Sequence, residues 1–383
     1  MFDVSRLDDG DGPISGVGAE SLRALATAGA QVRRMSTAAA EAGVLALTQE
    51  NRPRNVLVAA MGADHFVTDV ASTVADRTSA VAVVGASNVP LPGWVGALDL
   101  VIAVSLSGRA RGPLQLAAEA GRRGAQLLSV GAPDSPLAEV TARARGIHVA
   151  VDGDGLSSRT AAWSLLTPVV LALGQLGVLQ LSPEVLPALA DRLDAQAQVC
   201  RPSSESFVNP AKVLALDVAG RIPMILGDGP LTAVVARRFG SMLTRTARVP
   251  AMTGELPDAA SALLACLDGP FVASGIEGGR DIFADPFDAA PPTELALVAL
   301  RDPIGDPGEL LDVARHNLTQ GLLDLASESG ALVREVSAAP GPDLVRIAEL
   351  VARTDFAATY LALGYGHNPR HSAHVTRLRD LLG

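Results

Sequence analysis

Short apolar runs separated by helical stretches constrain the fold of this chain more than any other feature. In its first half the runs are NVLVAAMG, AVAVVGAS, LDLVIAVSLSG, AQLLSVGAP and IHVAVDGDG. They are continuously apolar rather than alternating, which is typical of strands buried on both faces of a parallel sheet. The stretches between them carry apolar residues at helical spacing. The sequence therefore predicts an α/β fold with right-handed crossovers.

The same pattern returns after the Pro- and Ser-rich segment 200–212, which we interpret as a linker. Its strand candidates are IPMILGDGPL, PFVASGIEGG, LALVALRDP and ALVREVSA. We therefore expect two α/β domains of similar build, residues 1–204 and 205–383. Hydrophobic residues make up 48% of the chain but aromatic residues only 3%, so aliphatic side chains must fill both cores.

Composition excludes several classes of function. A net charge of -10 disfavours nucleic-acid binding, which depends on Lys and Arg against phosphates. The longest apolar stretch is interrupted by Pro168, so it indicates a buried helix rather than a membrane span. Cys200 and Cys266 form no metal-ligand spacing and are expected to be buried thiols in a reducing compartment. We expect a cytoplasmic protein with no cofactor and no membrane or nucleic-acid partner.

Three loops follow strands of the first half, where open parallel sheets bind ligands. They are MGADH (61–65), SLSGRAR (105–111) and DGDGLSSRT (152–160). Backbone N–H groups at a helix start, together with Ser hydroxyls, can bind an anion without any lysine. A turn capped by serine is the alternative interpretation of SLSG.

Other motifs favour structural interpretations. Asp228 within GDGPLTAVVARR disfavours a phosphate there, so this glycine turn is predicted to be a tight strand-to-helix connection. His371 and His374 lie one helical turn apart near His367, and a solvated helix face is favoured over metal binding. His65, on a strand-end loop, is better placed for chemistry.

Taken together, these segments resemble the bifunctional glucose-6-phosphate/mannose-6-phosphate isomerases, which have two sugar isomerase (SIS) domains. The resemblance is strongest in NPAKVLALDVAGRIPMILGDGPLTAVVARRFGSMLTRTARVPAMTGELPDAA and in FAATYLALGYGHNP. In the first half, MGADHFVTD, SLSG and SSRTAAWSLLTPVV also fit. The resemblance implies two flavodoxin-like SIS domains, each a parallel sheet sandwiched by helices. It also implies a phosphorylated hexose or related sugar derivative as ligand, and a homodimer.

The resemblance places the family's catalytic positions on residues of the wrong chemistry. The glutamate base falls on Arg245, the ring-opening histidine on Ser261 and the C-terminal lysine on Arg379. An arginine stays protonated and cannot act as a general base. Lys212 is the only lysine of the chain and matches a different family element, so no substitute lysine exists.

The ligand-binding positions are partly retained. Those implied by the resemblance are Gly62, Asp64, Ser105, Ser107, Gly108 and Arg159. A family threonine falls on Ala110, and Asp64 replaces a family serine; its charge would repel a dianion by on the order of 1 kcal/mol. Arg109 and Arg111 either offset this charge or project into solvent.

Three hypotheses follow. The chain is a SIS protein that binds a sugar phosphate without isomerising it, a pseudoenzyme, which the replaced positions favour. Alternatively, it is an active phosphohexose isomerase in which Glu255 or His65 acts as the base, or a structural or regulatory dimer that binds no ligand.

Overall fold

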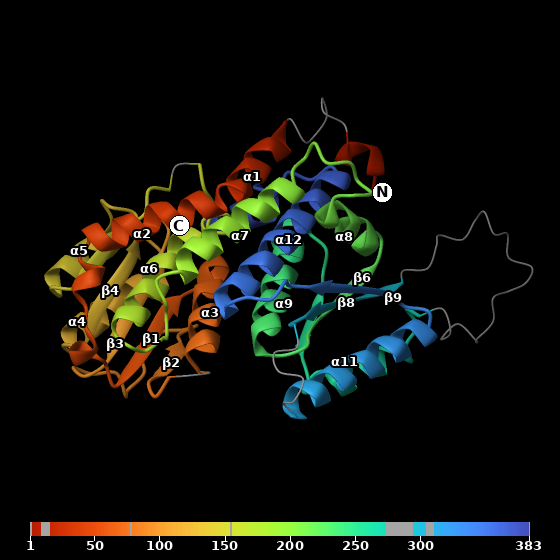
Figure 1. Cartoon of the computed structure of the whole chain (residues 1–383). Coiled ribbons are helices and arrows are strands. Elements are labelled where there is room, and N and C mark those ends of the chain that lie inside the picture. Colours follow the sequence, from red (N-terminus) through yellow and green to blue (C-terminus); the bar gives the residue numbers. More distant parts are fainter. Residues whose placement is uncertain are drawn as a thin grey trace, which may run out of the picture. The chain divides into compact units, whose positions relative to one another are not determined.

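The computed structural model describes residues 2–8, 16–76, 79–153, 155–272, 294–303 and 310–382. The chain divides into two compact units, each with its own parallel sheet (Figure 1). One unit comprises residues 24–195 and 342–345, and the other comprises 1–23, 196–341 and 346–383. Residues up to Arg23 thus group with the second half of the chain. The domain boundary after residue 204 stays a prediction.

The five apolar runs of the first half form the five strands of one sheet. They are β1 (Asn55–Ala60), β2 (Ala82–Gly85), β3 (Leu100–Ser105), β4 (Gln126–Gly131) and β5 (Ile147–Ala150). All neighbours pair in parallel, in the order β2-β1-β3-β4-β5. Every residue of β3 is buried, which explains why this run contains no alternating polar positions. The flavodoxin-like α/β fold is therefore confirmed for this unit.

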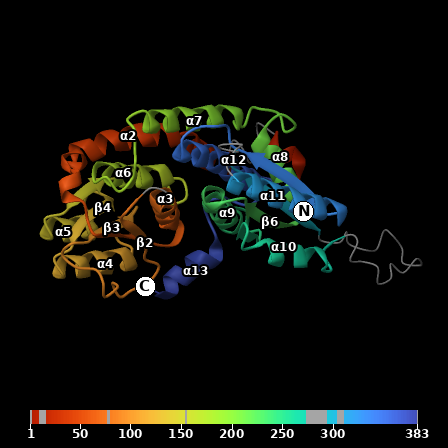
Figure 2. The same ribbon diagram turned by 60° about the horizontal axis from the view of Figure 1, so that its bottom comes forward.

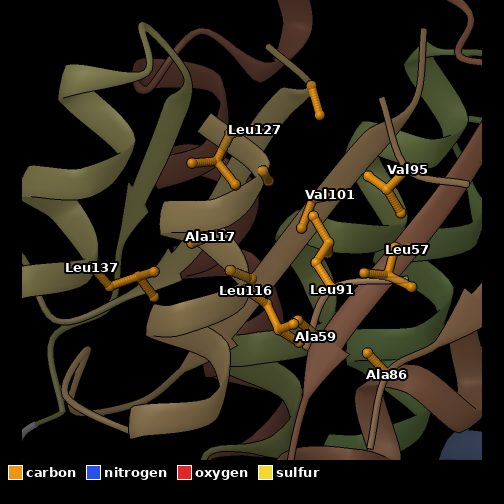
Figure 3. Packing of buried hydrophobic residues seen from close by; sticks show 13 residues of the cluster. Leu57, Ala59, Ala86, Leu91, Val95, Val101, Leu116, Ala117, Leu127 and Leu137 are labelled. Carbon is orange, nitrogen blue, oxygen red and sulfur yellow. The ribbon is translucent and has the colours of Figure 1, made fainter. Parts of the chain in front are cut away.

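Helices cover both faces of this sheet. On one face lie α2 (Ala28–Glu41), α3 (His65–Asp76) and α6 (Ala162–Gln175); on the other lie α4 (Arg111–Arg122) and α5 (Pro136–Arg143) (Figure 2). Beneath α4 and α5 a cluster of small and branched aliphatic side chains fills the core (Figure 3). The stretch 13–50 was expected to be helical. It contains α1 (Val17–Ala26), α2 and two short 3-10 turns, Val44–Ala46 and Gln49–Asn51.

The second unit repeats this arrangement with four strands. They are β6 (Ile222–Gly227), β7 (Met252–Glu255), β8 (Leu295–Arg301) and β9 (Leu332–Ser337), all parallel, in the order β7-β6-β8-β9. The expected strand within PFVASGIEGG lies mostly outside the described residues, while β7 was not predicted. This strand has four residues, none of them buried, and so lacks the apolar run that marks the others.

Helices also cover this second sheet. α9 (Pro230–Met242) packs on β6 and β7, while α10 (Ala260–Leu267) and α11 (Leu310–Glu328) pack over an apolar cluster that includes Met224, Leu297 and Leu323. Among the described residues, the other α-helices are α7 (Val185–Val199), α8 (Pro210–Val218), α12 (Asp343–Gly364) and α13 (Ala373–Leu382). No helix in the described part of the chain is long and apolar enough to cross a membrane.

The two cysteines differ in their surroundings. Cys200 is buried, and burial raises the pKa of its thiol to about 12, so it stays protonated. Cys266 is only partly buried, which corrects the expectation that both thiols would be in the core.

Candidate functional site

The strand order of the first unit creates a crevice between β1 and β3. From β1 the chain proceeds to one side of the sheet, to β2, and from β3 to the other side, to β4. Ligands of open parallel sheets bind at the carboxyl ends of the strands at such a reversal. The loops 61–65 and 105–111 follow β1 and β3 directly, so both border this crevice.

The loop after β3 combines hydroxyl groups with backbone amides. Ser105 is buried, and its Oγ accepts a hydrogen bond from the Ala110 N–H at 3.4 Å. Ser107 is exposed, and its Oγ accepts from the Arg109 N–H at 3.3 Å. Helix α4 then begins, and its N-cap residue, Ala110, has no side chain that could cap it. Hydroxyls and amides thus converge ahead of an uncapped helix N-terminus, an arrangement suited to an anion. Neither serine is the N-cap of α4, so the capped-turn interpretation does not hold for this helix.

Gly108 is required at its position for two reasons. Its φ is +63°, in the left-handed region that favours glycine. A Cβ atom there would also lie 2.1 Å from Ser135 Oγ. Ser135 begins α5, where its Oγ accepts from the Ala138 N–H and donates to the Ala132 carbonyl at 2.7 Å. Sequence reasoning missed Ser135, because the Ser-Pro signal for a helix start does not reveal a contact with another loop.

The loop after β1 lies against the start of α4. A Cβ on Gly112 would lie 2.2 Å from Met61 Sδ. Gly62 has a φ of +69°, and Asp64, which is buried, directly precedes α3. Its negative charge therefore lies beside the positive end of that helix. The structure thus brings the predicted residues of the β1 and β3 loops to one edge of the sheet.

The adjacent histidine points toward a carboxylate of its own helix. His65 Nδ1 lies 3.3 Å from the Ala60 carbonyl, and its Nε2 lies 3.6 Å from Asp69 Oδ1. The side chain is 44% exposed, so solvent or a ligand can reach it.

The arginines near this edge differ in exposure. Arg109 and Arg111 are exposed at the start of α4. Arg159 is half-buried in the loop between β5 and α6.

The positions that the resemblance assigns to catalysis belong to the other unit. Arg245 is exposed in a π-helical turn, Leu243–Ala247, after α9. Ser261 is exposed in the first turn of α10, and Arg379 lies in α13. Glu255, a proposed alternative base, lies 3.8 Å from Arg237 Nη1 with 40% of its side chain exposed.

The single lysine is enclosed within its unit. Lys212 is fully buried, and its Nζ donates to Asp8 Oδ1 and to the carbonyls of Pro202 and Ser204 at 2.8 to 2.9 Å. It also lies 5.5 Å from the centre of the Tyr360 ring. All three donor positions of this ammonium group are occupied, so Lys212 has a structural role.

At the equivalent position of the second sheet, after β6, a buried carboxylate makes internal contacts. Asp228 is buried, and its Oδ1 accepts from the Asp302 N–H at 3.0 Å and from Thr232 Oγ1 at 2.9 Å. Burial raises the pKa of the Asp228 carboxyl. The glycine turn therefore makes internal contacts, in agreement with its structural interpretation.

In the described part of the chain, the late histidines form no cluster with acidic groups. The His371 carbonyl accepts a hydrogen bond from Arg248 Nη2, and both His371 and His374 are exposed. Among the described residues no group of three or more His, Cys, Asp or Glu side chains could hold a metal ion.

The fold is similar to those of solved proteins along nearly the whole chain. A protein of Silicibacter pomeroyi DSS-3, provisionally described as a phosphosugar isomerase, superimposes with a TM-score of 0.61 and 17% identity, over 91% of this chain and 99% of that one. A hypothetical protein of Thermus thermophilus superimposes with a TM-score of 0.67 and 13% identity, over 99% of this chain and 92% of that one. A glucose-6-phosphate isomerase of Chlamydia trachomatis superimposes with a TM-score of 0.65 and 12% identity, over 94% of this chain and 77% of that one. These likenesses show that the chain shares the α/β fold of these proteins.

Sequence comparison identifies the relatives more closely. Residues 207–382 match the family of the bacterial phospho-glucose isomerase C-terminal SIS domain. A bifunctional phosphoglucose/phosphomannose isomerase of Caldicellulosiruptor bescii is 26% identical over 161 residues, which are 42% of this chain and 47% of that enzyme. The match thus spans about half the length of this curated relative. The resemblance to the bifunctional isomerases is confirmed for residues 207–382, which match a domain family of such enzymes.

Proposed function

We propose that this protein binds a phosphorylated hexose, or a related sugar derivative, in the crevice between β1 and β3 and does not isomerise it. The observation that carries the proposal is the loop Ser105–Ala110. Around Gly108, which has a positive φ, the hydroxyls of Ser105 and Ser107 lie beside the backbone amides that precede α4. A phosphate there would accept hydrogen bonds from the two serine hydroxyls, while the Arg109 and Ala110 amides donate to the serine oxygens. Gly62, Asp64 and Arg159 are the remaining proposed ligand contacts.

The absence of isomerisation is proposed on chemical grounds. Moving a proton between C1 and C2 of a sugar needs a base that is free to accept it near neutral pH. Arg245 cannot accept a proton, Ser261 is a poor substitute for a histidine, and Lys212 is enclosed by three acceptors.

Incubation with fructose 6-phosphate tests both parts of the proposal. We expect no glucose 6-phosphate or mannose 6-phosphate above the blank, and a rise in melting temperature when the sugar phosphate is added. The double variant Ser105→Ala/Ser107→Ala should lose that rise. Ser261→Ala, an exposed serine of the other unit, serves as the matched control and should keep it.

Two other functions predict different results. Turnover that is lost in His65→Gln or Glu255→Gln would identify an active isomerase with a substituted base. If the protein shows no turnover and no thermal shift, the remaining hypothesis is a structural or regulatory dimer that binds no ligand. We also propose that the protein is a homodimer and acts in the cytoplasm.

A further inference from the structure

The loop proposed to bind phosphate is backed by the turn after β4, residues 131–137. The Ala132 N–H donates to the Leu106 carbonyl, and the Leu137 N–H donates to the Gly108 carbonyl, both at 3.1 Å. A Cβ on Gly131 would lie 2.2 Å from the Ser105 carbonyl oxygen, so the two backbones pass close together. The position of the phosphate loop therefore depends on this backing turn.

The backing turn is fixed at both ends. Leu137 is fully buried in the aliphatic cluster beneath α4 and α5, beside Leu116 and Ala117 (Figure 3). At the other end the Ala132 carbonyl accepts from Ser135 Oγ at 2.7 Å and lies 3.2 Å from Nε2 of His148, on β5. His148 is thus joined through one carbonyl to the turn that supports Gly108.

The hydrogen bonds around His148 select one tautomer. Its Nδ1 lies 2.7 Å from Ser129 Oγ, which in turn lies 2.6 Å from Thr141 Oγ1. Thr141 Oγ1 also lies 2.8 Å from the Leu137 carbonyl, so its one proton can go either to that carbonyl or to Ser129. The Nδ1–H tautomer would leave a ring lone pair facing the Ala132 carbonyl. With Nε2–H donating to Ala132, Nδ1 accepts from Ser129, and Ser129 in turn accepts from Thr141.

We propose that His148 is a positioning residue for the phosphate loop: its Nε2–H fixes the Ala132 carbonyl, and the turn 131–137 then holds Leu106 and Gly108 in the geometry that binds an anion. The part of this inference that concerns a ligand rests on the proposed function. The part that concerns the position of the loop does not, and the two are tested separately.

Hydrogen exchange in the absence of ligand tests the position of the loop. His148→Leu removes the donor, and we expect amides of residues 106–110 to exchange about tenfold faster, the size expected for losing one buried hydrogen bond. His148→Gln can present an amide N–H near the position of Nε2 and should restore protection. His374→Leu, an exposed histidine of α13, is the control. Amides of β6 should be unchanged in all variants.

A measurement on the unaltered protein covers the case in which His148→Leu fails to fold. The ¹⁵N shifts of the His148 ring at pH 7.5 should report a protonated Nε2 and an unprotonated Nδ1. The opposite tautomer would overturn the proposal, as would unchanged exchange at 106–110 in a folded His148→Leu.

Ligand binding is measured last, with fructose 6-phosphate as the probe. We expect the dissociation constant to rise about tenfold in His148→Leu and to return to within about threefold of the original in His148→Gln. If the unaltered protein does not bind the probe, the proposed function fails, while the exchange result still decides the role of His148. Equal binding by all variants would overturn the positioning role.

Discussion

At the scale of single residues, Asp64 is the largest departure from the chemistry expected of a phosphate pocket. It is buried at the edge where the β1 loop meets the start of α4, at a position where the resemblance implies a serine. A carboxylate there favours ligands with less negative charge and weakens binding of a dianion.

Replacing this carboxylate should strengthen binding. We expect Asp64→Ser to lower the dissociation constant for fructose 6-phosphate by about tenfold, which corresponds to roughly 1.4 kcal/mol of relieved repulsion. Isothermal titration calorimetry at low ionic strength measures this. Asp258→Ser, an exposed acid of the other unit, is the control. Weaker binding by Asp64→Ser would mean that this carboxylate contacts the ligand favourably.

Lys212 is predicted to matter for stability alone. Lys212→Met should lower the free energy of unfolding by about 3 kcal/mol, because two partly buried carbonyls lose their donor and Asp8 loses its ion pair. Urea denaturation measures the change. Arg334→Met removes the partly exposed pair with Asp217 and should cost less than about 1 kcal/mol. Comparable losses in the two variants would contradict the structural role of Lys212.

At the scale of elements, the strand-end loops could be predicted but their supports could not. The apolar runs place SLSG directly after β3, and the order of alternating strands and helices places it at a ligand-binding edge. Ser135 contacts this loop and His148 contacts the turn behind it, both from later elements and through contacts that no local pattern encodes. The four-residue strand β7 was missed for a related reason, since none of its residues is buried.

Two glycines of the site allow the cost of backbone strain at positive φ to be separated from the cost of a steric clash of an added Cβ atom. Gly108 and Gly62 both have positive φ, but a Cβ on Gly62 would meet no atom within 4 Å. Gly62→Ala should therefore cost only about 1 kcal/mol from strain. Gly108→Ala should cost about 2 kcal/mol more, because it collides with Ser135. Thermal and urea unfolding of both variants decide this, and equal costs would show that the loop moves away from Ser135 freely.

The hydrogen-bonded chain from Thr141 to His148 predicts a pH dependence. Burial lowers the pKa of His148 below its usual 6.5, so the unfolded chain takes up a proton at higher pH than the folded one. This contribution to stability is complete above pH 6.5 and is lost as the pH falls toward the lowered value. Stability measured between pH 8 and 5 should fall less steeply in His148→Gln than in the original. His374→Gln should keep the original slope.

At the scale of the whole molecule, the two units were predicted from one repeated pattern. Apolar runs separated by helices recur on both sides of segment 200–212, and each set forms a parallel sheet with helices on both faces. The grouping of the first 23 residues with the second half could not be read from the sequence. This grouping includes an ion pair between Asp8 and Lys212, which are 204 positions apart. The residues around Asp8 contain no pattern that predicts this contact.

The assembly is predicted to contain two copies of the chain. We expect light scattering and sedimentation to give twice the chain mass of 39.2 kDa at micromolar concentration. The expectation comes from the resembled isomerases, in which the neighbouring subunit supplies the ring-opening histidine. A single-chain mass over a hundredfold range of concentration would refute it.

Because Lys212 is enclosed, its chemical modification can be used to measure local opening of the native structure. The chain has no other ε-amino group, and this one is inaccessible in the folded state. A reagent that acylates side-chain amines can modify Lys212 only after the contacts with Asp8, Pro202 and Ser204 have broken. The rate of that modification, followed by mass spectrometry, therefore gives the frequency with which this part of the native structure opens.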